Sequence, residues 1–168
     1  MKHLLFFLLT ITILNTYSIK NIQLSWQLPK EYGAFITYLI DSLNNSKNEI
    51  TIISEIIFHY DLKKTIRKIA KKGIKINIYT SVHQIENMNQ WSLYKNINLY
   101  ILKKDLIKPA LSYSIILIDK ERLFFISSSL NYHNLSNQLG LVFLTKNSKT
   151  PNFIKDIKNI SKPYCAIE

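Results

Sequence analysis

The segment that most limits the possible folds is residues 49–81, which reads EITIISEIIFHYDLKKTIRKIAKKGIKINIYTS. Its first seven residues are rich in β-branched side chains and predict a strand. Apolar residues then recur at helical spacing, at Leu62, Ile66, Ile69 and Ala70. Gly73 predicts the end of that helix, and Ile74, Ile76 and Ile78 alternate as in a strand. A strand, helix and strand of this length predict two parallel strands joined by a right-handed crossover.

The rest of the chain continues this alternation of helices and strands. Apolar residues at helical spacing predict a helix that ends near Asn44, and Pro151 predicts the start of a closing helix over 151–160. The polar stretch 81–96 predicts a short helix with a loop. The other predicted strands are residues 97–102, 113–118, 122–127 and 139–145. The turn at 119–122 is too short for a parallel crossover, so we expect an α/β sandwich around a mixed sheet.

The N-terminal segment has the layout of a secretory signal. A lysine at position 2 precedes an uncharged apolar run, and Thr16, Tyr17 and Ser18 form a small-x-small cleavage site. The apolar run is shorter than the roughly 20 residues that span a bilayer as a helix, so we expect no stable membrane span, and a retained anchor is the weaker alternative. We therefore expect a signal peptide over 1–18, cleavage near Ser18, a secreted or periplasmic protein, and a single domain over 19–168.

Cysteine usage leaves the domain without disulfide support. The chain contains a single cysteine, Cys165, so no disulfide can form within it. No pair of His, Cys or acidic residues has the spacing of a metal site, and we expect neither metal nor cofactor. The hydrophobic core must therefore stabilise the fold alone.

The chain is strongly basic, with a formal net charge of +11. Such an excess favours polyanionic partners, above all nucleic acid. The predicted helix after residue 59 carries six cations on its expected exposed stripe: Lys63, Lys64, Arg67, Lys68, Lys71 and Lys72. The alternative is that a Lys-, Ile- and Asn-rich composition accounts for the charge without any binding role.

A second segment has the shape of a site built at the end of a sheet. Residues 115–118 form an apolar run that ends at Asp119, and a polar turn leads into a second run that ends in Ser127, Ser128 and Ser129. His133 follows this serine cluster and is the best histidine for residual chemistry, although a surface role is the commoner one for such a residue. Asp119 has an alternative role too, because an Asp in a turn at a strand end often binds local backbone amides.

The order of these elements resembles the phospholipase D superfamily, especially its small secreted bacterial nucleases. That family's signature is H-x-K-x-x-x-x-D, six residues, and then G-S-x-N. Aligned on Asp119, the signature places Ser112 at the histidine and Ser114 at the lysine. Ser127 falls at the serine and Ser129 at the asparagine, or Asn131 if the alignment slides by two. Gln138 takes the place of a later acidic residue.

The resemblance implies a phospholipase D/nuclease-like α/β sandwich with a degenerate signature. In the family the histidine attacks phosphorus without a metal, and serine replaces neither that imidazole nor the lysine. We therefore expect an exported protein that has lost this catalytic pair. It would bind nucleic acid or another polyanion, or serve as a dimer partner, either with itself or with an active paralogue.

The resemblance leaves an alternative function and predicts one feature of the site. The alternative function is an active phosphodiesterase, a nuclease or phospholipase D-type enzyme, that uses other residues such as His133 and a serine of the cluster. The alignment also predicts that Asp119 and Ser127 face the same cavity.

Overall fold

The computed structural model describes residues 22–81, 84–102, 112–146, 152–159 and 161–164. Residues 1–21, with the predicted signal peptide, and His83, Pro151 and Cys165 lie outside the described residues. No helix among the described residues is long and apolar enough to cross a membrane.

The strands form one mixed sheet in the order β1-β7-β6-β5-β2-β3-β4-β8. Their bounds are β1 Ile22–Leu28, β2 Glu49–Ile53, β3 Lys75–Ser81, β4 Ile97–Leu102, β5 Ser114–Ile118, β6 Arg122–Ile126, β7 Gly140–Lys146 and β8 Ser161–Pro163. The predicted parallel crossover is confirmed, because β2 and β3 pair in parallel. The predicted β5–β6 pair is antiparallel, as is the pairing of β5 with β2. The mixed α/β sheet is therefore confirmed.

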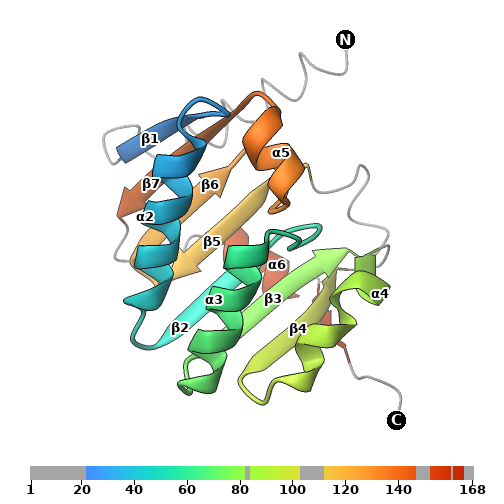
Figure 1. Cartoon of the computed structure of the whole chain (residues 1–168). Coiled ribbons are helices and arrows are strands. Elements are labelled where there is room, and N and C mark those ends of the chain that lie inside the picture. Colours follow the sequence, from blue (N-terminus) through green and yellow to red (C-terminus); the bar gives the residue numbers. More distant parts are fainter. Residues whose placement is uncertain (1–21, 82–83, 103–111, 147–151, 160, 165–168) are drawn as a thin grey trace.

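Helices cover both faces of this sheet (Figure 1). One face carries α2 (Tyr32–Asn44), α3 (Tyr60–Lys71), α4 (Ile85–Met88) with the 3-10 helix η3 (Asn89–Leu93), and α5 (Tyr132–Asn137). The other face carries α6 (Asn152–Asn159). Helices α2 and α3 match the predicted apolar spacing, and α3 ends before Gly73, whose φ of 92° suits a residue without a side chain.

Two hydrophobic clusters fill the spaces between the sheet and its helices. The larger lies under α2 and α3 and includes Phe35, Leu39, Ile52 and Ile78. The smaller lies between the sheet and α6 and includes Ile154. Because successive side chains of a strand point to opposite faces, each central strand feeds both clusters.

Candidate functional site

The serines that the resemblance aligned with the signature gather at one end of the β5–β6 pair. Ser114 opens β5 and lies opposite Ile126, the last residue of β6. Ser127 to Ser129 continue directly from that residue. Ser112 precedes β5 and is exposed. The fold thus brings Ser114 and the serine cluster together, with Ser112 beside them in the chain.

Ser114 is fully buried and held by two neighbours. Its Oγ donates to the Ser128 carbonyl at 2.8 Å and lies 2.8 Å from the Oγ of Ser54, which is also fully buried. Ser54 in turn donates to the carbonyl of Ile56 at 2.9 Å. Two hydroxyls supply only two protons, so two of these three contacts are hydrogen bonds at any moment. The set still ties the end of β2, β5 and the serine cluster together.

Ser127 and Ser129 likewise serve the local backbone. The Oγ of Ser127 accepts from the Leu141 amide at 2.8 Å. The Oγ of Ser129 accepts from the side-chain amides of Asn131 at 3.0 Å and Asn134 at 2.6 Å. Asn131 also caps α5, because its Oδ1 accepts from the Asn134 amide at 2.7 Å. These contacts fix the path of the chain from β6 into α5 and β7.

Asp119 lies at the opposite end of the β5–β6 pair, in the turn. Its carboxylate accepts from the backbone amides of Lys47 at 2.9 Å, Asn48 at 2.8 Å and Glu49 at 3.1 Å. The expectation that Asp119 and Ser127 face one cavity is wrong. The five residues of β5 separate the two ends by about 16 Å at about 3.3 Å per residue. Asp119 instead takes the alternative role of binding backbone amides.

The histidines differ from the expectation as well. His133 is exposed on α5, where its Nδ1 lies 3.3 Å from the Asn137 side-chain amide, and it has no hydrogen bond to the serine cluster. His59 is buried beside that cluster, since its backbone amide donates to the Leu130 carbonyl at 3.2 Å. Sequence reasoning gave His59 no special place, and no motif singles it out.

His59 is the N-cap of α3 and packs among aromatic rings. Its Nδ1 accepts from the Leu62 amide at 3.4 Å, and its Nε2 lies 2.6 Å from the Tyr32 hydroxyl. The Tyr132 ring lies 6.0 Å from the imidazole, centroid to centroid. Burial lowers the pKa of His59, although the nearby Asp61 acts in the other direction. Because a neutral imidazole with Nδ1 accepting must carry its proton on Nε2, His59 donates to Tyr32 rather than activating it.

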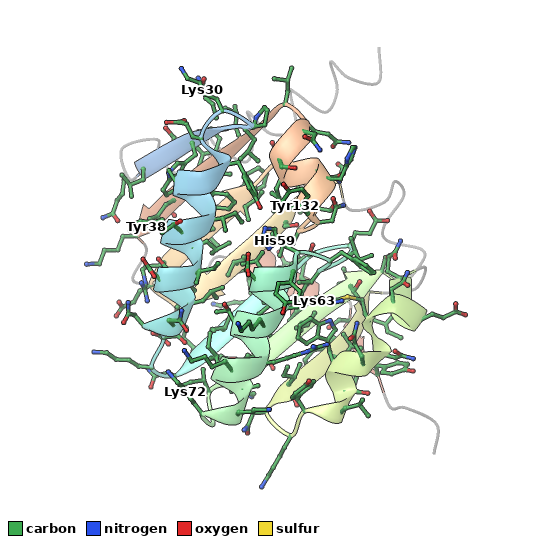
Figure 2. The ribbon with its side chains drawn as sticks, viewed as in Figure 1. Lys30, Tyr38, His59, Lys63, Lys72 and Tyr132 are labelled. Atoms are coloured by element: carbon green, nitrogen blue, oxygen red, sulfur yellow. The ribbon has the colours of Figure 1, made fainter. Side chains whose placement is uncertain are left out.

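Most basic side chains of α3 and its C-cap are exposed to solvent (Figure 2 labels Lys63 and Lys72). Four lysines are exposed along it: Lys64, Lys68, Lys71 and Lys72. Lys63 is half-buried, with its Nζ 4.4 Å from the centre of the Phe58 ring.

Arg67 departs from the predicted exposed stripe. Its guanidinium carbon lies 5.6 Å from the Trp91 ring and 5.8 Å from the Tyr94 ring, and Nη2 donates to Gln90 Oε1 at 2.8 Å. Arg67 therefore joins α3 to η3 instead of facing solvent with the lysines.

Within the part of the chain that the structure describes, no group of three His, Cys or acidic residues is placed to hold a metal ion. The described residues combine a serine cluster closed by its own hydrogen bonds with a row of exposed lysines on the adjacent helix.

Solved structures show what this chain is similar to. It matches NucT from Helicobacter pylori with a TM-score of 0.72 and 18% identity, over 84% of this chain and 98% of that one. It matches Nuc from Salmonella typhimurium, a phospholipase D family member, with a TM-score of 0.69 and 15% identity, over 85% and 97%. The archaeal chromatin protein TrmBL2 matches with a TM-score of 0.53 and 15% identity, over 94% and 58%.

The sequence itself matches no protein-family model and no curated protein. The similarity is therefore one of fold, and it extends over nearly the whole length of NucT and Nuc. The chain has the α/β fold of the phospholipase D superfamily nucleases.

Proposed function

We propose that this chain is a phospholipase D-like protein without the catalytic His-Lys pair, and that it binds nucleic acid through α3. The observation that carries the proposal is the contrast between Ser114 and α3. At the position that the resemblance gives to the lysine, a buried serine is bound to Ser54 and to the Ser128 carbonyl. The cations that could meet phosphate are exposed on the adjacent helix instead.

The chemistry of the serine cluster supports binding over catalysis. A serine that attacks phosphorus needs a neighbouring base and cations to stabilise the developing charge. Among the described residues, no hydrogen bond joins Ser114, Ser127 or Ser129 to a histidine or lysine. Removal of a nucleophile alone lowers turnover by up to about a million-fold in a measured case.

The spacing of the lysines supports contact with a phosphate backbone. Lys64, Lys68 and Lys71 lie on one stripe of α3, one turn apart, and Lys72 adjoins them. Ammonium groups that neutralise phosphates release counterions, which gives affinity without sequence preference. TrmBL2, which has the same fold in part, is described as a chromatin protein with a novel mode of DNA binding.

Two charge-matched variants test this role of α3. In the first, Lys64, Lys68, Lys71 and Lys72 are all changed to Gln. In the second, four exposed lysines outside α3 are changed to Gln: Lys30, Lys47, Lys95 and Lys120. Binding of a fluorescent DNA is measured by anisotropy across a salt series. We expect the α3 variant to lose affinity and to reduce the slope of log K against log salt by up to about 3.6, at about 0.9 per phosphate contact.

The control variant has the same net charge, so it separates a local site from a general charge effect. It should keep most of the affinity. Equal weakening of both variants would contradict an α3 site and would favour a compositional origin of the charge.

A second candidate function, assembly with another copy, rests on a group of exposed apolar side chains at the serine-cluster end. Phe58 is 52% exposed, Tyr60 74%, Tyr132 59% and Leu139 92%. Such side chains gathered at one place often mark an interface. Light scattering of the wild type and of Leu139→Ser would test this assembly. If the wild type is a homodimer through this surface, the variant should dissociate. A wild-type protein that stays monomeric at high concentration excludes a homodimer.

Export also belongs to the proposal. The signal-like residues 1–18 support it, and N-terminal sequencing of the mature protein should find a start near Ile19. A mature protein that retains Met1 would contradict export by this route.

A further inference from the structure

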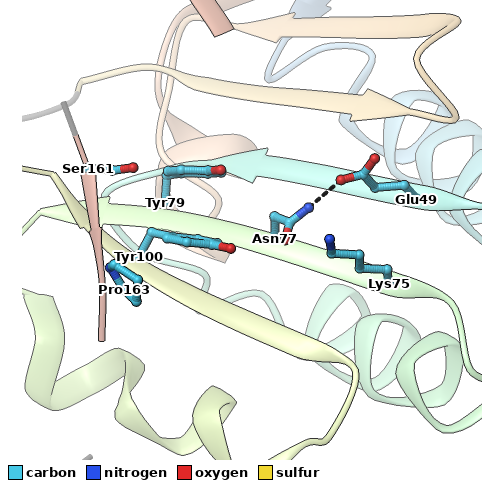
Figure 3. Close-up of a pocket in the computed structure, with 7 residues that line it drawn as sticks. All are labelled: Glu49, Lys75, Asn77, Tyr79, Tyr100, Ser161 and Pro163. Carbon is cyan, nitrogen blue, oxygen red and sulfur yellow. Dashed lines mark hydrogen bonds between the residues drawn. The ribbon is translucent and has the colours of Figure 1, made fainter. Parts of the chain in front are cut away.

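A cavity of about 300 Å³ opens on the sheet face opposite to the serine cluster (Figure 3). Its lining comes from β2, β3, β4 and β8: Glu49, Lys75, Asn77, Tyr79, Tyr100, Ser161 and Pro163. Tyr79 belongs to the hydrophobic cluster under α6, whereas Ile116, two residues after Ser114 in β5, belongs to the cluster under α2 and α3. The cavity and the serine cluster are therefore separate sites, and neither the signature alignment nor the proposed nucleic-acid function uses the cavity.

The protein itself holds the polar groups of this cavity in place. The parallel register places Glu49 beside Lys75, Asn77 beside Asn98, and Tyr79 beside Tyr100. The Asn77 amide donates to Glu49 Oε1 and accepts from Asn98 Nδ2 at 3.0 Å. The rings of Tyr79 and Tyr100 stack with centroids 4.7 Å apart. Groups fixed in this way lose little freedom when a ligand binds.

Four groups that line the cavity keep hydrogen-bonding capacity. The second carboxylate oxygen of Glu49, the Lys75 ammonium and the hydroxyls of Tyr79 and Tyr100 have no hydrogen-bond partner among the described residues. Figure 3 shows both tyrosine hydroxyls directed along the strands toward Asn77. Burial, with smaller effects of Tyr100 and Glu49, raises the pKa of Tyr79 to about 12, so its hydroxyl stays protonated at neutral pH. The cavity thus offers one anionic acceptor and three donors.

This combination restricts the ligand. The Glu49 carboxylate repels an inorganic anion, and the Lys75 ammonium repels a simple cation. A hydroxyl group satisfies both at once, because it donates its proton to a carboxylate while its lone pairs accept from an ammonium. The Pro163 ring adds an apolar wall for C–H groups.

We propose that this cavity binds a polyhydroxylated ligand of about the size of one monosaccharide. One hydroxyl donates to Glu49 and accepts from Lys75, and a second oxygen accepts from the hydroxyls of Tyr79 and Tyr100. The same chemistry is offered by a free sugar and by the terminal residue of a glycan.

The test is an NMR titration of the full chain, which follows backbone amide shifts. The probes are D-glucose, D-galactose and D-mannose, then their methyl glycosides. Glycine is the control ligand, because it carries one ammonium and one carboxylate in place of hydroxyl groups. We expect saturable shifts around the cavity with at least one sugar, at a dissociation constant on the order of 1 mM. Glu49→Gln and Tyr100→Phe should each weaken binding roughly tenfold, because Gln replaces a charged acceptor oxygen by an amide donor and Phe removes a hydroxyl, each with little change of shape.

Matched controls are Glu121→Gln and Tyr38→Phe, which make the same chemical changes at exposed positions outside the cavity and should leave the affinity unchanged. If free sugars bind and their methyl glycosides do not, the cavity takes free sugars. If both bind equally, it takes the terminal residue of a glycan. The proposal is overturned if no sugar shifts the cavity residues, if both cavity variants bind like the wild type, or if glycine alone binds. DNA binding by α3 is a separate measurement and its failure leaves this result unaffected.

Discussion

The hydroxyl of Ser114 lies 2.8 Å from the hydroxyl of Ser54, and both side chains are completely buried, although 60 residues separate them in the chain. This contact joins β5 to the end of β2 beneath the serine cluster. Ser114 stands where the aligned signature has a lysine, so this contact fills the space that the lysine of the family's active site would need.

Replacing Ser114 with Lys should destabilise the fold. The larger, charged side chain would enter a closed site where the hydrogen-bond partners of Ser114 are a hydroxyl and a carbonyl. Burying a charge without a counter-charge costs several kcal/mol. Urea unfolding should show a clear loss for Ser114→Lys. Ser112→Lys is the control, and it should cost little because Ser112 is exposed. Equal stability of the two variants would mean that space exists around Ser114.

A double variant designed to restore the family's catalysis should be inactive, because a lysine does not fit at the buried position of Ser114. Ser112→His with Ser114→Lys returns the two side chain types that the signature requires, but the lysine has no open site to occupy. We expect no phosphohistidine and no metal-free cleavage of single-stranded DNA. A folded double variant that forms the covalent intermediate would show that the site reopens when the signature returns.

Asp119 should matter for stability and not for binding. Asp119→Ala removes the acceptor of three backbone amides and places Ala at a φ of 53°, a region that Asp and Asn tolerate better. We expect a loss of about 2–4 kcal/mol in the free energy of unfolding. Asp119→Asn should lose less, because it keeps one acceptor oxygen and tolerates the backbone conformation. Loss of DNA binding by a variant with unchanged stability would contradict this role.

His59 should make the fold sensitive to acid. Burial holds its folded-state pKa below the ordinary value of about 6.5. The unfolded state therefore takes up the proton first, so the stabilisation is complete above pH 6.5 and is lost as the pH falls through the folded-state pKa. Urea unfolding at pH 7.5 and pH 5 measures the effect. The pH dependence should shrink in His59→Gln and persist in His133→Gln; the reverse pattern would assign it to the exposed histidine.

Arg67 should stabilise the contact between α3 and η3. Changing Arg67 to Gln removes a guanidinium from the faces of Trp91 and Tyr94 and one hydrogen bond to Gln90. We expect a loss of about 1–2 kcal/mol in thermal or urea unfolding. Lys64→Gln, on the exposed face of the same helix, removes the same charge and should change stability by less than about 0.5 kcal/mol. Similar losses in both would point to helix electrostatics as the cause.

The sequence predicts the elements whose pattern is local. The apolar spacing of α2 and α3, the alternation in β3 and the short turn between β5 and β6 each lie within a few residues. Strand β1 and helix α5 were not predicted. Only Trp26 and Leu28 of β1 are buried at the sheet edge, and the segment YHNLSN of α5 has no helical apolar stripe.

The site was harder to predict because its contacts are distant in sequence. Ser114 meets Ser54, and Asp119 meets the amides at the start of β2, 70 to 72 residues away. Strand pairing brings Ser114 and Ser127, two positions that the signature alignment marks, to one end of the β5–β6 pair. The alignment could not reveal that Asp119 lies at the opposite end of the β5–β6 pair, because a linear motif does not show which end of a strand faces a site.

Binding of DNA without cleavage can be measured in one reaction. The full chain is incubated with end-labelled single-stranded DNA in chelator, and the same sample is run on a native gel and on a denaturing gel. We expect retarded DNA on the native gel and full-length DNA on the denaturing gel. Shortened DNA that disappears with Ser114→Ala, His59→Gln or His133→Gln would contradict it, because the chain would then be an active phosphodiesterase.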